Sequence, residues 1–170
     1  MIQSLGTLMR AFQERTDGAI AQLYADLGLP DYRPRYSPVV RALVETGPMT
    51  IRDLATAIGV THSAASQTVT QMRRAGFLDL HPGPADARQR IVHLTGRCRD
   101  ALPLIEAEWQ ATTLAIATLD AELPIPLADL LTSALQALED HPFRTRLLAT
   151  APLAAYRDQR SPADGKGPVM

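Results

Sequence analysis

The stretch from Met49 to Ala75 constrains the fold more than any other part of the sequence. Apolar residues recur at steps of three and four between Ile51 and Ile58, which is the spacing of one buried helix face. Gly59 follows, where a residue with a left-handed backbone ends a helix at little cost. Thr61 is a favourable N-cap for a second helix, which we expect to end at Gly76. The sequence therefore predicts two short helices joined by a tight turn.

Two short runs of β type follow, from Phe77 to His81 and from Arg90 to Leu94. The connection between them, PGPADARQ, is rich in turn residues, so the pair is predicted to form a hairpin with a long tip. Asp86 and Arg88 lie in that tip, and Arg90 begins the return strand. An arginine held on such a ribbon is suited to phosphates or to the narrow minor groove of DNA, although the tip also fits an ordinary charged loop.

Helical patterns flank this central part. A long helix is predicted from Ile2 to Leu27 and a short one from Ser37 to Glu45. After Thr95, which is placed to cap another helix, apolar positions from Leu102 to Leu119 follow a heptad-like seam, typical of helices that pack nearly parallel to a partner. A last helix is predicted from Leu127 to Leu148. The predicted fold is mainly α, with a single two-stranded hairpin.

The composition is that of an ordinary globular domain, with 46% hydrophobic and 21% charged residues. A single cysteine, Cys98, excludes an internal disulfide framework and a zinc site of four thiolates. Arg10 and Glu14 interrupt the apolar core that a secretory signal would need. No stretch reaches the roughly 18 apolar residues of a membrane-spanning helix, so we expect a cytoplasmic protein.

The net charge of −1 hides an uneven distribution of charge. Residues 50–99 contain seven arginines and three aspartates, a net charge of +4, and no acidic residue lies between Asp53 and Asp79. One positive region on a nearly neutral protein is a plausible footprint for nucleic acid. Chance segregation of charge on a solvated surface is the alternative.

The second helix of the central pair, from Thr61 to Arg74, has an apolar face formed by Ala65, Val69 and Met72. The positions opposite or flanking that face hold hydrogen-bonding or basic side chains and no acid: Ser63, Ser66, Gln67, Thr70, Gln71 and Arg74. Such side chains reach base edges and phosphates in the major groove. A solvated surface helix more often mixes Glu with Lys for local pairing. The pattern favours DNA binding over a plain exposed face.

No catalytic constellation is present, because the sequence has neither a Gly-rich phosphate loop nor a GxSxG motif, and we expect no enzyme activity and no cofactor. The four histidines have no compact metal-binding spacing, so no metal site is predicted. Cys98 lies between Arg97 and Arg99, a setting that can lower a thiol pKa, so redox sensing is kept as a minor alternative.

Residues 47–95 resemble the MarR family of bacterial transcriptional regulators. The resemblance is carried by LA…GVTHSAASQTV…MRRAGFL, by the D-x-R signature at Asp86 to Arg88, and by V-x-L-T at Val92 to Thr95. The matching motifs lie within residues 37–95, and the predicted order of helices resembles that of the family over the whole chain. The sequence departs from the family pattern at two positions. Ala87 stands where relatives usually have a second basic residue, and the glycine that follows the L-T pair comes immediately, at Gly96, which is earlier than usual.

The resemblance implies a winged helix-turn-helix, with a two-stranded β-hairpin wing and long N- and C-terminal dimerisation helices. Residues 1–30 and 96–150 would form the dimerisation region, residues 37–95 the DNA-binding lobe, and residues 157–170 a disordered tail. A homodimer would bind a palindromic operator, as a repressor rather than an activator because occupancy of a promoter suffices. The residues expected at the DNA are Thr61, His62, Ser63, Ser66, Gln67, Thr70, Gln71, Arg73, Arg74, Asp86, Arg88 and Arg90.

Many relatives bind a small aromatic effector between the dimer helices and the DNA-binding lobe. The candidates here are Phe12, Tyr24, Tyr36 and Trp109, which fit a plain core as well as a pocket. An alternative function is a winged-helix module for dimerisation or protein docking that does not read DNA. Against it, the second helix keeps a polar face without acids, and the chain has no room for a catalytic domain.

Overall fold

The computed structural model of the chain describes residues 4–83, 89–153 and 156. The chain falls into two compact units, residues 1–112 and 113–170, and each is described by itself. None of the helices in the described ranges is long and apolar enough to cross a membrane.

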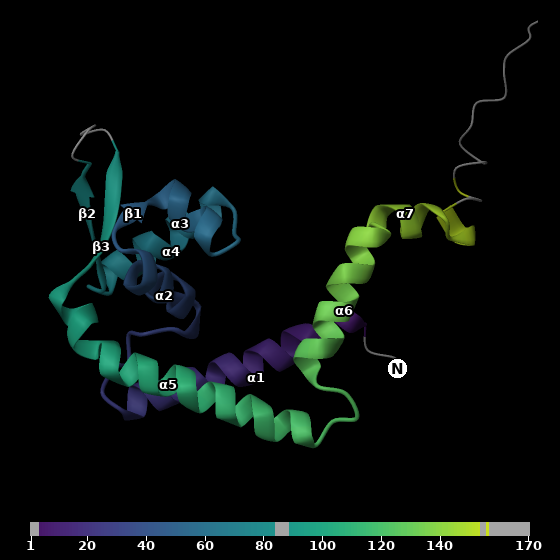
Figure 1. Ribbon diagram of the computed structural model, residues 1–170, viewed down its shortest axis with the longest axis horizontal. Helices are drawn as coiled ribbons and strands as arrows, with labels where there is room; N and C mark the ends of the chain where they lie inside the picture. Colours follow the sequence, from purple (N-terminus) through teal and green to yellow (C-terminus); the bar gives the residue numbers. More distant parts are fainter. Residues whose placement is uncertain (1–3, 84–88, 154–155, 157–170) are drawn as a thin grey trace, which may run out of the picture. The chain divides into compact units, whose positions relative to one another are not determined.

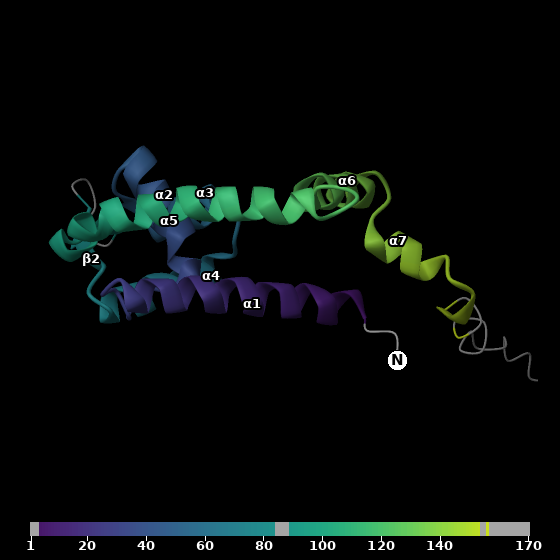
Figure 2. The same cartoon turned by 90° about the horizontal axis from the view of Figure 1, so that it is seen from below.

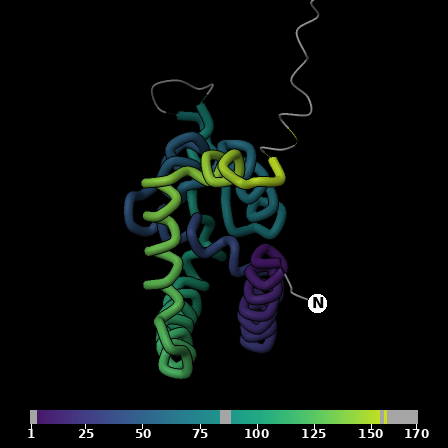
Figure 3. The backbone as a smooth tube through the Cα atoms, turned by 90° about the vertical axis from the view of Figure 1, so that its right-hand side faces the viewer, coloured from purple at the N-terminus to yellow at the C-terminus, as the bar shows by residue number. Residues whose placement is uncertain are grey.

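The first unit is helical with one small sheet, and the β2–β3 hairpin and α1 lie at its opposite ends (Figures 1 and 3). Its elements, in chain order, are α1 (Leu5–Asp26), the 3-10 helix η1 (Pro34–Tyr36), α2 (Ser37–Thr46), β1 (Met49–Thr50), α3 (Ile51–Ala57), α4 (His62–Arg74), β2 (Leu78–Pro82), β3 (Arg90–Leu94) and α5 (Gly96–Ala121), which continues into the second unit. The predicted order of helices and the hairpin are confirmed.

The sheet has three antiparallel strands in the order β1-β3-β2. The hairpin register pairs Leu80 with Val92 and Asp79 with His93, so alternate residues point to opposite faces. Val92 is fully buried on the inner face, whereas Asp79 lies on the outer face. The sequence analysis missed β1, in which Met49 pairs with Val92. Two residues are too short to show the alternation that identifies a strand.

An aromatic cluster forms the centre of the first unit. Tyr32 lies between Tyr24, Tyr36 and Phe77, with ring centroids 4.6, 5.7 and 5.4 Å away, and the four side chains are almost entirely buried. Edge and tilted arrangements of this kind suit the charge distribution of aromatic rings. Figure 2 shows that α1 and the first turns of α5 run in opposite directions. The cluster therefore joins the end of α1 to the segment that follows α4.

The second unit contains the end of α5, α6 (Leu127–Asp140) and α7 (Phe143–Leu148). The prediction of one helix from Leu127 to Leu148 was wrong, because the chain is extended at His141 (φ −134°, ψ 91°) before Pro142. A proline disfavours helical backbone at the residue before it and has no N–H to donate. The Asp120 carboxylate accepts the Leu127 N–H at 2.9 Å and fixes the turn before α6.

Candidate nucleic-acid interface

Helix α4 has the amphipathic form predicted from its sequence. Thr61 caps it by accepting the Ala64 N–H at 3.2 Å, and Gly76 beyond its C-terminus has a positive φ of 77°. The side chains of Ala65, Val69 and Met72 are buried, with exposed fractions of at most 1%. The opposite face of α4 must therefore point away from the core.

That opposite face carries a continuous polar stripe. A shallow groove of about 240 Å³ runs along it, and the residues that line the groove are Ser66, Gln67, Thr70, Gln71 and Arg74. The Thr70 hydroxyl donates to the Ser66 carbonyl at 2.8 Å, so its oxygen remains available as an acceptor. Thr61, His62, Ser63 and Arg73 are exposed on the same helix or at its cap. The structure thus brings the predicted α4 residues onto one accessible surface.

A second cleft, of about 510 Å³, lies where the starts of α3 and α4 meet the start of β3. Arg52, His62, Gln89 and Arg90 line it, together with Thr50, Ile51 and Asp53. Asp53 is engaged at the start of α3, since its carboxylate accepts the Thr50 hydroxyl at 2.8 Å while Thr50 accepts the Asp53 N–H at 3.1 Å.

Arg52 and Gln89 were not among the predicted site residues. In the sequence, Arg52 stands off the apolar face formed by Leu54, Ala55 and Ile58, which is the signal that it is exposed. Its proximity to Arg90 depends on how α3 meets the sheet, so no local pattern reveals it. The predicted residues Asp86 and Arg88 lie outside the described residues.

The four predicted effector residues occupy different environments. Tyr24 and Tyr36 are buried in the aromatic cluster, whereas Phe12 is 37% exposed on α1. Trp109 is half-buried, and the Arg41 guanidinium lies over its ring at 4.5 Å. A cleft of about 330 Å³ between α2 and α3 contains none of the four; it is lined by Ser37, Pro38, Arg41, Ala42, Glu45, Ala57 and Ile58.

A buried polar contact joins α1 to α5, and the sequence analysis missed it. Glu108 is only 6% exposed. The Tyr24 hydroxyl donates to its carboxylate at 2.7 Å, and the Thr112 hydroxyl donates to its other oxygen at 2.5 Å. Burial and the hydrogen bond to Glu108 raise the pKa of Tyr24 well above its usual range, so the phenol remains protonated. Glu108 follows Ile105 by three residues, a spacing that places it beside the apolar seam.

Cys98 differs from the sequence-based expectation. Burial raises the pKa of its thiol to about 11, and the charge of Arg99 offsets only part of this effect. The side chain is fully buried, so an activated thiolate is not present. His81 and His93 stack at 4.6 Å on the outer face of the hairpin, but no group of three metal-ligating side chains occurs among the described residues.

Two helices joined by a tight turn, followed by a hairpin beside the second helix, define a winged helix-turn-helix protein. Residues 31–89 match the model of the MarR family. The matched segment runs from just before η1 to just before β3 and includes the helix-turn-helix. No curated protein sequence matches the chain.

Several solved structures share this fold. PcaV, a transcriptional regulator from Streptomyces coelicolor determined with its natural ligand, is 19% identical, with 83% of this chain and 99% of that chain covered and a TM-score of 0.57. BpsR from Bordetella bronchiseptica, whose DNA binding is regulated by 6-hydroxynicotinic acid, is 18% identical. The match covers 81% of this chain and 94% of that chain, with a TM-score of 0.56. CouR, a transcriptional repressor bound to a 23-mer DNA duplex, is 20% identical. The match covers 80% of this chain and 92% of that chain, with a TM-score of 0.57.

Proposed function

We propose that the protein is a sequence-specific DNA-binding regulator of transcription. The observation that carries the proposal is the polar, acid-free stripe on α4, whose opposite face is fully buried. Amide, hydroxyl and guanidinium groups supply the donors and acceptors that distinguish base pairs in the major groove. CouR, which has the same fold, was determined on duplex DNA.

The cleft that contains Arg52 and Arg90 is suited to the DNA backbone rather than to bases. It contains two guanidinium groups and the His62 side chain, whereas its carboxylate, Asp53, is hydrogen-bonded at the start of α3. Arginine binds phosphate oxygens through several N–H groups at once. Contacts of this kind orient a protein on the duplex and supply the salt-dependent part of affinity.

The proposed binding form is a homodimer on a palindromic operator. Two copies of α4 would then enter successive major grooves, roughly 34 Å apart. Support comes from the apolar side chains that the single chain leaves exposed at its ends, such as Leu8 on α1 and Leu135 on α6. Exposed apolar side chains on each of the two units are expected to be covered by a partner.

The proposed mode of action is repression that a small aromatic effector relieves. The ligands of PcaV and BpsR support this proposal by analogy alone. An effector would act by binding more tightly to a dimer whose α4 helices hold the wrong separation, which shifts the population away from the DNA-binding form. Because the target is chromosomal DNA, we place the protein in the cytoplasm.

The test is fluorescence anisotropy with DNA from the protein's own promoter region and a random duplex of equal length, at several salt concentrations. Wild-type protein is expected to prefer promoter DNA. Gln67→Ala should reduce that preference, since loss of one base contact costs about 1–3 kcal/mol. Arg90→Ala should weaken binding to both duplexes and reduce the slope of log affinity against log salt by about 0.9, one phosphate contact.

Arg144→Ala is the matched control, because Arg144 is an exposed arginine of α7 outside the winged segment. This variant should retain both the preference and the salt slope. Equal affinity of the wild-type protein for promoter and random DNA would contradict the proposal. It would instead favour a winged-helix module that docks another protein.

A further inference from the structure

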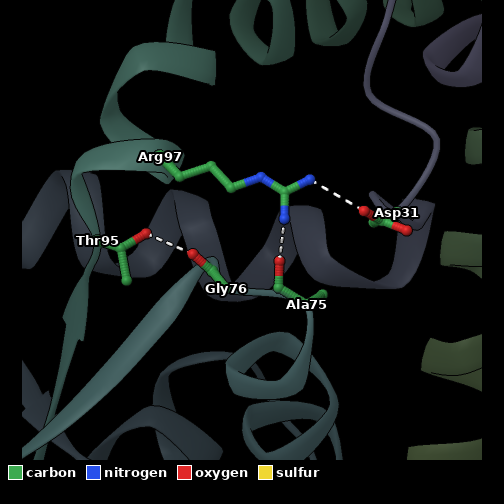
Figure 4. A network of polar contacts seen from close by, with 5 residues as sticks. All are labelled: Asp31, Ala75, Gly76, Thr95 and Arg97. Carbon is green, nitrogen blue, oxygen red and sulfur yellow. Dashed lines mark hydrogen bonds and ion pairs between the residues drawn. The ribbon is translucent and has the colours of Figure 1, made fainter.

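Arg97 joins three segments of the first unit through one side chain (Figure 4). It lies in the first turn of α5. One of its terminal N–H groups donates to the carbonyl of Ala75, the C-cap residue of α4, and the other donates to the Asp31 carboxylate at 3.0 Å. The guanidinium also lies over the ring of Phe77, 4.6 Å from its centroid.

The end of α4 is held by further hydrogen bonds from the same short segment. The Thr95 hydroxyl donates to the Gly76 carbonyl at 2.7 Å, and the Thr95 N–H donates to the Phe77 carbonyl at 3.1 Å. The carbonyls of Ala75, Gly76 and Phe77 lie just beyond Arg74, the last residue of α4, so donors outside the helix bind them. A cation there also interacts favourably with the helix dipole. The C-terminus of α4 and the start of α5 therefore form one junction.

The contact with Asp31 extends this junction to the loop between α1 and η1. The side chains of Arg97 and Asp31 are 45% and 59% exposed, so the ion pair itself adds little stability. Its effect is geometric, because a guanidinium with two fixed acceptors and a ring beneath it has one preferred orientation. Tilting α4 against the α1–η1 loop would break at least one of these contacts.

We propose that Arg97 is a positioning residue for DNA recognition, one that orients α4 without touching DNA. The inference rests on the proposed function. Arg97 is one of the seven arginines of the basic segment, and a phosphate contact is the competing role for it. Its guanidinium is already committed to Ala75, Asp31 and Phe77, whereas Arg90 lines an open cleft. An aligned α4 matters for base contacts far more than for non-specific attraction to phosphates.

The test compares Arg97→Ala, Arg97→Lys and Asp31→Asn in the anisotropy experiment, with Arg99→Ala as a control that removes an exposed charge from the same helical turn. All three junction variants are expected to lose about 2- to 30-fold in affinity for promoter DNA, the range for residues that act without ligand contact. Their affinity for random DNA and their salt slope should be unchanged. Lysine should fail to rescue, because it keeps the charge but not the two-acceptor geometry.

Other outcomes would overturn the inference. Equal losses on both duplexes, with a reduced salt slope and rescue by lysine, would make Arg97 a phosphate contact. If all three variants bound promoter DNA as the wild-type protein does, Arg97 would have no role in recognition. A uniform loss accompanied by a smaller active fraction in stoichiometric titration would indicate damage to the fold instead.

A second measurement does not depend on DNA. Amide hydrogen exchange should accelerate in Arg97→Ala at both residues 28–33 and residues 72–78, but not in Arg99→Ala. Unchanged exchange at either segment would contradict the positioning role, even if the wild-type protein bound no DNA selectively. Failure of the proposed function and failure of this inference are therefore distinguishable.

Discussion

At the residue scale, the buried phenols of Tyr24 and Tyr32 and the buried thiol of Cys98 are held in their neutral forms. Burial raises the pKa of the Tyr32 phenol above its usual range, as it does for Tyr24, and raises the pKa of the Cys98 thiol to about 11. Each of these acids must lose a proton in order to become charged. Folding therefore favours the protonated forms over the range where the unfolded chain would already ionise.

Stability is expected to fall at alkaline pH. The folded-state pKa values of these groups lie above their unfolded values, so their contribution is complete below the unfolded values, about 8.5 for a thiol and 10 for a phenol. It is lost as the pH rises toward the folded values. For Cys98 the loss is on the order of 2 kcal/mol by about pH 10.5. Thermal unfolding from about pH 7 to about pH 10.5 measures it.

Cys98→Ala is the companion variant in that experiment. It should be less stable than the wild-type protein near neutral pH and should show a smaller decrease toward alkaline pH. An identical pH dependence of the two proteins would mean that the thiol does not contribute. The same burial predicts slow alkylation of Cys98 in the folded protein.

At the element scale, the contact of Tyr24 and Thr112 with Glu108 fixes how α1 meets α5. A carboxylate that is almost fully buried is costly unless hydrogen bonds stabilise it, and two hydroxyl donors supply them here. Removal of one donor leaves the charge less satisfied than before. The contact should therefore contribute more to stability than the exposed hydrogen bonds of the same helix.

Tyr24→Phe is expected to lower the free energy of unfolding by about 1.5–3 kcal/mol, the range for a hydrogen bond to a charged group. Thr112→Val should also be destabilising. Thr118→Val is its matched control, because Thr118 is exposed on α5 and its hydroxyl donates only to the Ala115 carbonyl. Urea unfolding at fixed protein concentration gives the comparison. Equal effects of the two threonine variants would show that Glu108 gains nothing from its donor.

Local signals predicted most of the elements. Thr61 caps α4, and Gly59 has the left-handed backbone expected at the end of a helix, with φ of 69°. The buried face of α4 follows from its spacing alone. The errors arose where a signal was too short or was overlooked: β1 has two residues, and Pro142 divides the last predicted helix.

At the scale of the whole molecule, the chain leaves apolar side chains without cover inside a single copy. No residue of α6 is buried, although Leu130, Leu131, Leu135 and Leu138 all lie on it. Near the N-terminus, Leu8 on α1 is 50% exposed. Exposed leucines in such numbers favour association with a second copy, as the predicted heptad-like seam also indicates.

Leu135→Glu is expected to weaken the proposed dimer. The variant places a charge at a position that is 63% exposed in one chain and that the proposed dimer would cover. Sedimentation velocity over a range of protein concentrations should show more monomer than for the wild-type protein. Gln136→Glu, which introduces the same charge at the next residue of α6, is the control and should remain dimeric. A dimer unaffected by Leu135→Glu would exclude this face of α6 from the interface.

The sequence by itself determined most of the helices, the hairpin and the polar stripe of α4, because periodicity and caps act over a few residues. Only the tertiary structure decided which distant residues meet. Arg97 lies 66 residues from Asp31, and Tyr24 lies 84 residues from Glu108, so their contacts depend on the path of the whole chain. Burial likewise decided the state of Cys98. Its neighbouring arginines suggested a lowered thiol pKa, but the cost of desolvating the thiolate outweighs the charge of Arg99.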